Sequence, residues 1–446
     1  MMNTTRKAVL KPFEDKKDYM NDRVEHGIET YRKGWARVTV TDPDGKPVPA
    51  ARVKIRQTGH DFKYGANLFM LDEFPAAEQN RKYEQQFADA FNLATLPFYW
   101  NTLEPEPGKP RFAKDSPKIY RRPAPDLCLE YCERHGIEPK AHCLNYESFT
   151  PAWAIGPVMT EKRLLEKRFR ELAERYAARI PSWEVTNETF WGMNLHRLNF
   201  YDEPDFVEWS FDTADRYFHT NRLIINEAQC RIWDNEHFYG NRSPYFMQVE
   251  RALAHGARID SIGMQFHMFY RAEYELKETA QYYDPERIFQ VLDTYARLGT
   301  SLQVTEMTIP AYSNAGEDEE LQAEIIRNLY RMWFSHPAME AIIYWNLVDG
   351  FAYGTTPGDM AAGENYFYGG LIRYDFTPKP AYHVIRDLFE KTWRTNLEAA
   401  TDADGVVDFK GFYGEYEVEI DAGSRHRTRA FHLGRGLNPN LTVSLA

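Results

Sequence analysis

Short apolar runs alternate with amphipathic stretches through most of this 446-residue chain, and this alternation restricts the possible folds more than any other feature. A strand that is repeatedly followed by a helix is typical of a parallel sheet with helices packed against it. The runs at residues 223–226, 259–264, 302–305 and 341–345 read as strands, and those at 161–178 and 319–334 as helices. We therefore predict the α/β fold class.

Polar or ionisable residues stand where many of the predicted strands end. They are Asn187, Glu188, Asn226, Glu227, Gln265, His267, Glu306 and Asp349. In a (β/α)₈ barrel the C-terminal ends of the strands meet on one face and carry the chemistry. An open doubly wound sheet is the alternative, but no glycine-rich phosphate loop follows any predicted strand. We predict a TIM barrel over residues 61–396.

Both ends of the chain show a second pattern, in which polar and apolar residues alternate one by one. Residues 38–57 form two such runs around a Pro-Asp-Gly turn, and residues 406–420 and 427–445 continue the pattern. Neither end has enough strands to bury a face alone. We predict that residues 1–60 and 397–446 are β segments that together form one small accessory β-sandwich.

Charge and hydropathy exclude several classes of partner. The net charge of −12 argues against nucleic acid, which needs clustered Lys and Arg. No apolar run is long enough to span a membrane, and residues 1–20 lack the apolar core of a secretory signal. We predict no membrane partner and a cytoplasmic location, or secretion if a leader has been removed.

Cysteine usage gives no reason to expect a metal or a disulfide framework. Cys128 and Cys132 lie four residues apart with His135 beyond them, but no second ligand pair stands at zinc-finger spacing. We predict no metal and no cofactor.

Two strand-end glutamates suit one particular chemistry. Cleavage of a glycosidic bond needs one carboxylic acid to protonate the leaving oxygen and a second carboxylate to attack carbon or activate water. Glu188 closes the run SWEVTNE, and Glu306 closes the run SLQVTE. Each glutamate follows an apolar strand that would hold it rigidly at the mouth of a barrel.

The chain resembles glycoside hydrolase family 10, the xylanase family, across most of residues 61–390. Six segments agree with the family's motifs in order and spacing. They are WEVTNE at 183–188, VTEMT at 304–308, HCLNYESFTPAW at 142–153, IDSIGMQFH at 259–267, WNLVD at 345–349 and PKPAY at 378–382.

The resemblance implies the catalytic roles. Glu188 would be the general acid/base, and Glu306 would be the nucleophile. His267 would donate a hydrogen bond to Glu306, which would lower its pKa and keep it ionised. Gln265 would lie beside them in the same pocket.

The resemblance also implies which side chains bind the sugar. His142 and Asn187 would bind hydroxyls of the sugar in subsite −1, and Trp345 would form an apolar wall against it. Trp100 and Trp191 are further candidates for the cleft.

Several positions depart from the family pattern. The segment at residues 91–100 is two residues shorter than its counterpart and lacks the sugar-binding Glu, Asn and Lys. Tyr146 and Tyr353 stand where the family has tryptophans, and Glu147 stands in place of a histidine. We predict that these three residues contact substrate and that the sugar-recognition wall has been rebuilt.

The sequence therefore predicts a retaining, endo-1,4-β-xylanase-like glycoside hydrolase whose partner is an oligosaccharide or polysaccharide. Two alternatives stay open. One is an exo-acting or oligosaccharide-specific β-glycosidase on a glycan other than xylan, and the other is a barrel that binds carbohydrate without cleaving it. The oligomeric state is not fixed by the sequence.

Overall fold

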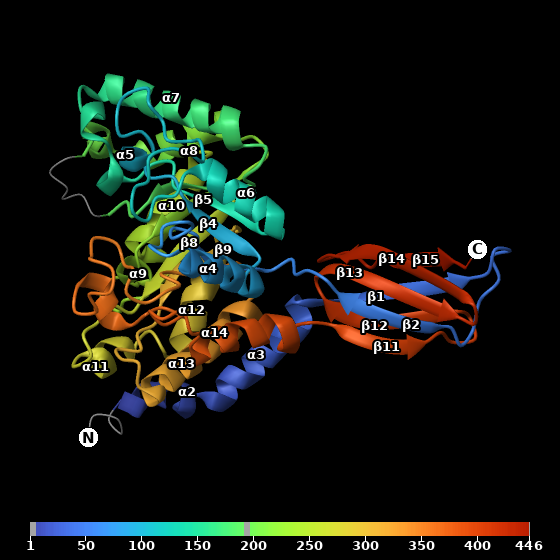
Figure 1. Cartoon of the computed structure of the whole chain (residues 1–446). Helices are drawn as coiled ribbons and strands as arrows, with labels where there is room; N and C mark the ends of the chain where they lie inside the picture. The colour runs from blue at the N-terminus through green and yellow to red at the C-terminus, as the bar shows by residue number, and fades with distance from the viewer. Residues whose placement is uncertain (1–5, 191–196, 446) are drawn as a thin grey trace.

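A computed structural model describes residues 6–190 and 197–445. It consists of a helix-covered barrel and a smaller pair of sheets that projects from one end of it (Figure 1). This arrangement confirms the predicted TIM barrel with an accessory β-structure.

Eight parallel strands close the barrel in the order β10-β3-β4-β5-β6-β7-β8-β9. Most of their residues are buried, because the strands face the packed interior on one side and helices on the other. Gly65 permits the close approach of β3 to β4, since a Cβ there would lie 2.2 Å from the Leu93 carbonyl oxygen. The strands are β3 (Lys63–Asn67), β4 (Leu93–Pro97), β5 (Glu138–His142), β6 (Ser182–Asn187), β7 (Arg222–Glu227), β8 (Ser261–His267), β9 (Ser301–Thr308) and β10 (Met339–Tyr344).

The helices between these strands bury one apolar face each. In α12, Ile288, Leu292 and Tyr295 recur at helical spacing and are fully buried, and the Asp284 carboxylate caps the first turn through the backbone N–H of Glu286 at 3.0 Å. The helices are α4 (Ala77–Ala90), α5 (Trp100–Leu103), α6 (Pro125–His135), α7 (Val158–Tyr176), α8 (Phe206–Tyr217), α9 (Gln229–Ile232), α10 (Pro244–Ala254), α11 (Glu275–Thr279), α12 (Pro285–Ala296), α13 (Gly316–Ser335) and α14 (Pro380–Asp387). Among the described residues, none of the helices combines the length and the apolar character needed to cross a membrane.

The accessory sheets combine strands from both ends of the chain. One sheet has the order β12-β1-β15 and the other β11-β2-β13-β14, and their facing apolar residues, including Val38, Val53 and Val418, form a core separate from that of the barrel. The strands are β1 (Lys33–Thr41), β2 (Arg52–Gln57), β11 (Asn396–Ala400), β12 (Val406–Phe412), β13 (Gly414–Ala422), β14 (Arg425–Leu433) and β15 (Asn440–Ser444).

The accessory sheets lie at the end of the barrel opposite to the C-terminal ends of its strands. Strand β2 ends at Gln57, and only five residues separate it from the N-terminal end of β3 at Lys63. In a barrel of this kind the loops at the C-terminal ends form the active site. The accessory sheets therefore have no direct access to that face.

The prediction of a β segment over residues 1–60 is wrong for its first half. The chain forms a 3₁₀ turn, η1 (Lys7–Leu10), and two helices, α2 (Lys11–Asp15) and α3 (Lys17–Tyr31), before the first strand begins at Lys33. Met20 and Val24 lie four residues apart, so they share one face of α3, which packs on α13. The contact is close, because a Cβ on Gly27 would lie 2.4 Å from the Ser335 carbonyl oxygen. Dense charges between these apolar residues hid the helix.

Removal of the C-terminal strands tests whether strands from the two ends of the chain depend on each other in the accessory sheets. A chain that stops before β11 leaves β1 and β2 without any partner strand, and unpaired edges with an exposed apolar face favour aggregation. We expect this truncated protein to be insoluble or to unfold at a lower temperature than the full chain in a thermal melt. An unchanged melting temperature and solubility would contradict the arrangement.

Candidate active site

A cavity of about 320 Å³ opens at the C-terminal ends of the barrel strands. Most of the residues that the sequence analysis assigned to the site line it; the exceptions are Glu147 and Trp100, and Trp191 lies outside the described residues. The predicted residues that line the cavity are His142, Tyr146, Asn187, Glu188, Gln265, His267, Glu306, Trp345 and Tyr353. They come from strands β5, β6, β8, β9 and β10 or from the loops that follow these strands, as the strand-end pattern predicted.

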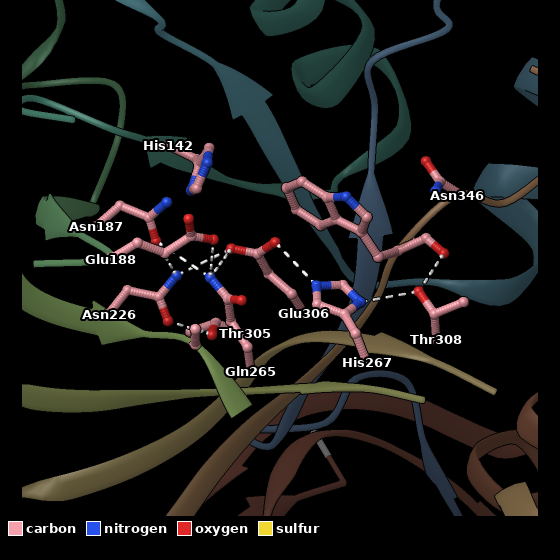
Figure 2. A network of polar contacts seen from close by, with 12 residues as sticks. His142, Asn187, Glu188, Asn226, Gln265, His267, Thr305, Glu306, Thr308 and Asn346 are labelled. Carbon is pink, nitrogen blue, oxygen red and sulfur yellow. Dashed lines mark hydrogen bonds and ion pairs between the residues drawn. The ribbon is translucent and has the colours of Figure 1, made fainter. Parts of the chain in front are cut away.

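The carboxylates of Glu188 and Glu306 face each other across the cavity (Figure 2). The side-chain nitrogen of Gln265 donates to both, at 2.9 Å to Glu188 Oε1 and 3.1 Å to Glu306 Oε1. These two oxygens therefore lie within about 6 Å of each other, the sum of the two contacts, which suits the roughly 5–5.5 Å of a retaining pair. Glu188 has a positive φ of 50°, a strained conformation that turns its side chain into the cavity.

Three donors surround the Glu306 carboxylate. Besides Gln265, the Asn226 amide donates to Oε1 at 3.0 Å, and His267 Nε2 lies 3.3 Å from Oε2. His267 Nδ1 lies 3.0 Å from the Thr308 hydroxyl, and burial lowers the pKa of His267 to about 4. Both ring nitrogens of His267 thus have a polar neighbour, Glu306 at Nε2 and Thr308 at Nδ1, and these two contacts hold the plane of the ring.

The predicted direction of the Glu306 pKa shift is wrong. Burial raises the pKa of Glu306 to about 8, the negative charges of Glu184 and Glu188 add to this rise, and the positive charge of His142 opposes it. The hydrogen bond from His267 is present, but the loss of water around a carboxylate that is 4% exposed outweighs it.

Glu188 and Asn187 are held by neighbours on other strands. The Tyr146 hydroxyl donates to Glu188 Oε2, so the residue that replaces the family's tryptophan contacts the predicted acid directly. The Asn187 side-chain oxygen Oδ1 accepts from Asn226 at 2.7 Å and from Gln265 at 3.3 Å, which fixes the direction of the side-chain amide.

A charged cluster beneath the cavity was not found from the sequence. Glu184 contacts both Lys140 and His142 inside the barrel, and all three side chains are almost completely buried. Burial opposes the charge of Glu184, but Lys140 and His142 outweigh it and lower the pKa of Glu184 to about 2. The sequence signal that could have revealed this cluster is the presence of charged residues inside two strands that are otherwise buried.

The cluster also bears on metal binding. One ligand atom each from His142, Glu184 and Glu306 lies within 4.8 Å of the others, a spacing that a metal ion could use. The Lys140 ammonium already supplies the counter-charge to Glu184. A second cation there would meet direct repulsion, so these residues do not fit a metal site.

Aromatic side chains form one wall of the cavity. The Trp345 ring lies 5.1 Å from Phe69 and 5.4 Å from His142, measured between ring centroids. Tyr353 is 54% exposed at the rim, where it packs on Phe149. Trp100 instead packs on Trp153 away from the cavity, and Trp191 lies outside the described residues.

Glu147 is placed differently from its prediction. It is buried beside a separate small pocket behind Glu188, and its carboxylate lies 3.4 Å from Arg197 Nε. The structure thus places Glu147 in an ion pair and not in the cavity wall.

Two arginines in the wall were also missed. Arg121 and Arg122 belong to the long loop between α5 and α6, which follows strand β4. The only signal was an Arg-Arg pair in a loop after a strand, and a pair of that kind in a loop is usually solvated.

Comparison with known proteins agrees with this geometry. The profile of glycosyl hydrolase family 10 matches residues 69–388. The endo-1,4-beta-xylanase B of Thermotoga neapolitana is 25% identical over 342 residues, which cover 74% of this chain and 88% of that protein. The crystal structure of xylanase 10B from Thermotoga petrophila in complex with xylobiose superimposes with a TM-score of 0.58 at 21% identity and covers 74% of this chain and 95% of that one.

A further relative covers more of the chain. The anti-sigma-I factor RsgI6 of Acetivibrio thermocellus is 23% identical over 422 residues, or 93% of this chain, and this chain spans only 48% of that protein. The likeness to RsgI6 thus extends beyond the region that the family profile covers. The profile itself spans well over half of the residues, so the chain belongs to glycosyl hydrolase family 10.

Proposed function

We propose that the chain cleaves β-1,4-linked, xylose-based oligosaccharides with retention of configuration, with Glu306 as nucleophile and Glu188 as general acid/base. The observation that supports this proposal most is the single Gln265 nitrogen shared by the two carboxylates. A separation of this size leaves room for the anomeric carbon but not for an intervening water molecule.

In the first step Glu306 attacks the anomeric carbon while Glu188 gives its proton to the glycosidic oxygen. The bond between that carbon and oxygen breaks, and the leaving sugar departs with the proton. Asn226, Gln265 and His267 hold the Glu306 carboxylate in position for this attack.

In the second step Glu188 acts as a base. It takes a proton from water, the resulting hydroxide attacks the anomeric carbon, and the ester bond to Glu306 breaks. The Tyr146 hydroxyl donates to Glu188 Oε2 and thereby holds this carboxylate in place for the proton transfer.

The second candidate function is carbohydrate binding without cleavage, inside a longer regulatory protein. The match of the anti-sigma-I factor RsgI6 to 93% of the chain favours it. A binding protein has no need of two facing carboxylates together with the hydrogen-bond donors that hold them. We therefore favour the enzyme, and hydrolysis of an aryl β-xyloside separates the two.

The roles of the two glutamates can be separated with an activated substrate. We expect Glu306→Gln to lower turnover of a dinitrophenyl β-xylobioside by about three or more orders of magnitude, because no nucleophile remains. Glu188→Ala should still release dinitrophenol in a burst, since this leaving group needs no acid, and azide should restore turnover by replacing the base. NMR of the early product should show the β-anomer, and an α-anomeric product would contradict retention.

The raised pKa of Glu306 predicts the pH dependence of the first step. Only ionised Glu306 can attack, so kcat/KM of the wild type should fall as the pH drops through about 8. Glu188→Gln removes a negative charge that raises the pKa of Glu306. With the dinitrophenyl substrate, the acid limb of this variant should therefore move to lower pH, and an unchanged limb would contradict the coupling.

The rebuilt wall predicts the preferred length of substrate. Because the short segment at residues 91–100 lacks the usual sugar contacts, we expect kcat/KM to be higher on short xylo-oligosaccharides than on polymeric xylan. Product analysis on both substrates checks this expectation. A clear preference for the polymer, with random internal cuts, would point to an ordinary endo-xylanase.

A further inference from the structure

Two buried cations line the cavity without a carboxylate partner. Arg121 and Arg122 are 3% and 4% exposed, and neither forms an ion pair within the described ranges 6–190 and 197–445. Burying a guanidinium without a counter-charge is unfavourable, because the charge loses its water of hydration. A bound anionic ligand would supply the missing counter-charge.

Arg122 is stacked but poorly hydrogen-bonded. Its guanidinium lies 4.0 Å from the centre of the Tyr99 ring and 4.9 Å from that of Tyr353. It donates to the Arg121 carbonyl oxygen at 2.9 Å, while its Nε is buried without a partner among the described residues. Burial lowers the pKa of Arg122 to about 10, and the charge of Arg121 adds to this effect. The stacking orients a planar fork of N–H donors whose hydrogen-bonding capacity is mostly unused.

The Arg121 guanidinium is held by more hydrogen bonds than that of Arg122. Its guanidinium donates to the Phe351 carbonyl oxygen at 2.5 Å and to the Asn346 side-chain oxygen at 2.6 Å. Its backbone has a positive φ of 60°, a strained conformation that residues other than glycine rarely adopt. Strain of this kind persists where the surrounding contacts impose one arrangement, as they do here.

The arginines lie one layer of aromatic rings away from the reacting carboxylates. Tyr99, under Arg122, packs on His142 at 5.1 Å, and Phe69, within 6 Å of both arginines, packs on Trp345 at 5.1 Å. His142 is the residue that the family resemblance places against the sugar of subsite −1. The other charged groups in the wall are Glu188, Glu306 and Glu364, and none of them forms an ion pair with either arginine.

We infer that Arg121 and Arg122 bind the carboxylate of a uronic-acid unit on the glycone side of the bond that is cleaved. A carboxylate matches the planar guanidinium fork and supplies the missing counter-charge, whereas a neutral sugar hydroxyl supplies only a hydrogen bond. The inference rests on the proposed function for the orientation of the substrate, but it concerns binding and can be tested without turnover.

The first test compares ligands that differ only in charge. Calorimetry on the Glu306→Gln protein would measure the affinity for a uronosyl-substituted xylo-oligosaccharide and for the same compound with its carboxyl group reduced to a hydroxymethyl group. We expect the acidic ligand to bind about 10–100-fold more tightly, the range for hydrogen bonds to charged groups. Equal affinities would overturn the inference, and so would tighter binding of a sulfated analogue, which would indicate a site for another anion.

The second test compares variants. Arg122→Met keeps the apolar stem and removes the charge, so the preference for the acidic ligand should fall to near unity, while Arg122→Lys should retain part of it. Arg163→Gln, an exposed change of equal charge on α7, is the control and should leave the preference unchanged. If Arg122→Met does not fold, the inference can still be tested with Arg122→Lys and with the acidic and reduced ligands on the Glu306→Gln protein.

The outcomes separate this inference from the proposed function. Tight, charge-dependent binding by a wild-type protein that cleaves no glycoside would refute the hydrolase and leave the inference standing. Normal cleavage of a neutral aryl xylobioside, together with equal binding of the acidic and reduced ligands, would refute the inference alone.

Discussion

The structure depends on the concentration of negative charge at one end of a closed barrel. Glu184, Glu188 and Glu306 converge there, and Glu184 and Glu306 are almost fully buried. A buried carboxylate without compensation costs several kcal/mol. Lys140 and His142 neutralise Glu184, whereas Glu306 receives only neutral donors. The same strands thus keep one carboxylate firmly ionised and raise the proton affinity of another.

The hydrogen-bond network around Glu306 connects several strands of the barrel. The donors come from different strands of the barrel: Asn226 from β7 and Gln265 from β8 both donate to Glu306, and Thr305 from β9 donates to Asn226 (Figure 2). A hydrogen-bonded chain of this kind keeps its members in one orientation, because any rotation would leave a buried polar atom without a partner. The register of the barrel strands therefore sets the positions of the reacting atoms.

The sequence was sufficient for the barrel and for most of the cavity wall. Strand-end positions converge on one face whatever the details of packing, so the pattern placed Glu188, Gln265 and Glu306 at the same end of the barrel, and the family resemblance supplied their roles. Arg122 could not be found in this way, because its placement depends on the path of a long loop. The pKa of Glu306 was also out of reach, since hydrogen-bond partners can be guessed from a motif but the degree of burial cannot.

The pairing of the two chain ends has a consequence for synthesis on the ribosome. Strand β1, at residues 33–41, pairs with β12 and β15, and the last of these lies at residues 440–444. At roughly 5–20 residues per second, the N-terminal strands emerge tens of seconds before their partners exist. The whole barrel can be translated in that interval. The first strands to be synthesised are therefore among the last to find their partners. During translation, β1 and β2 are the segments that stay unpaired longest.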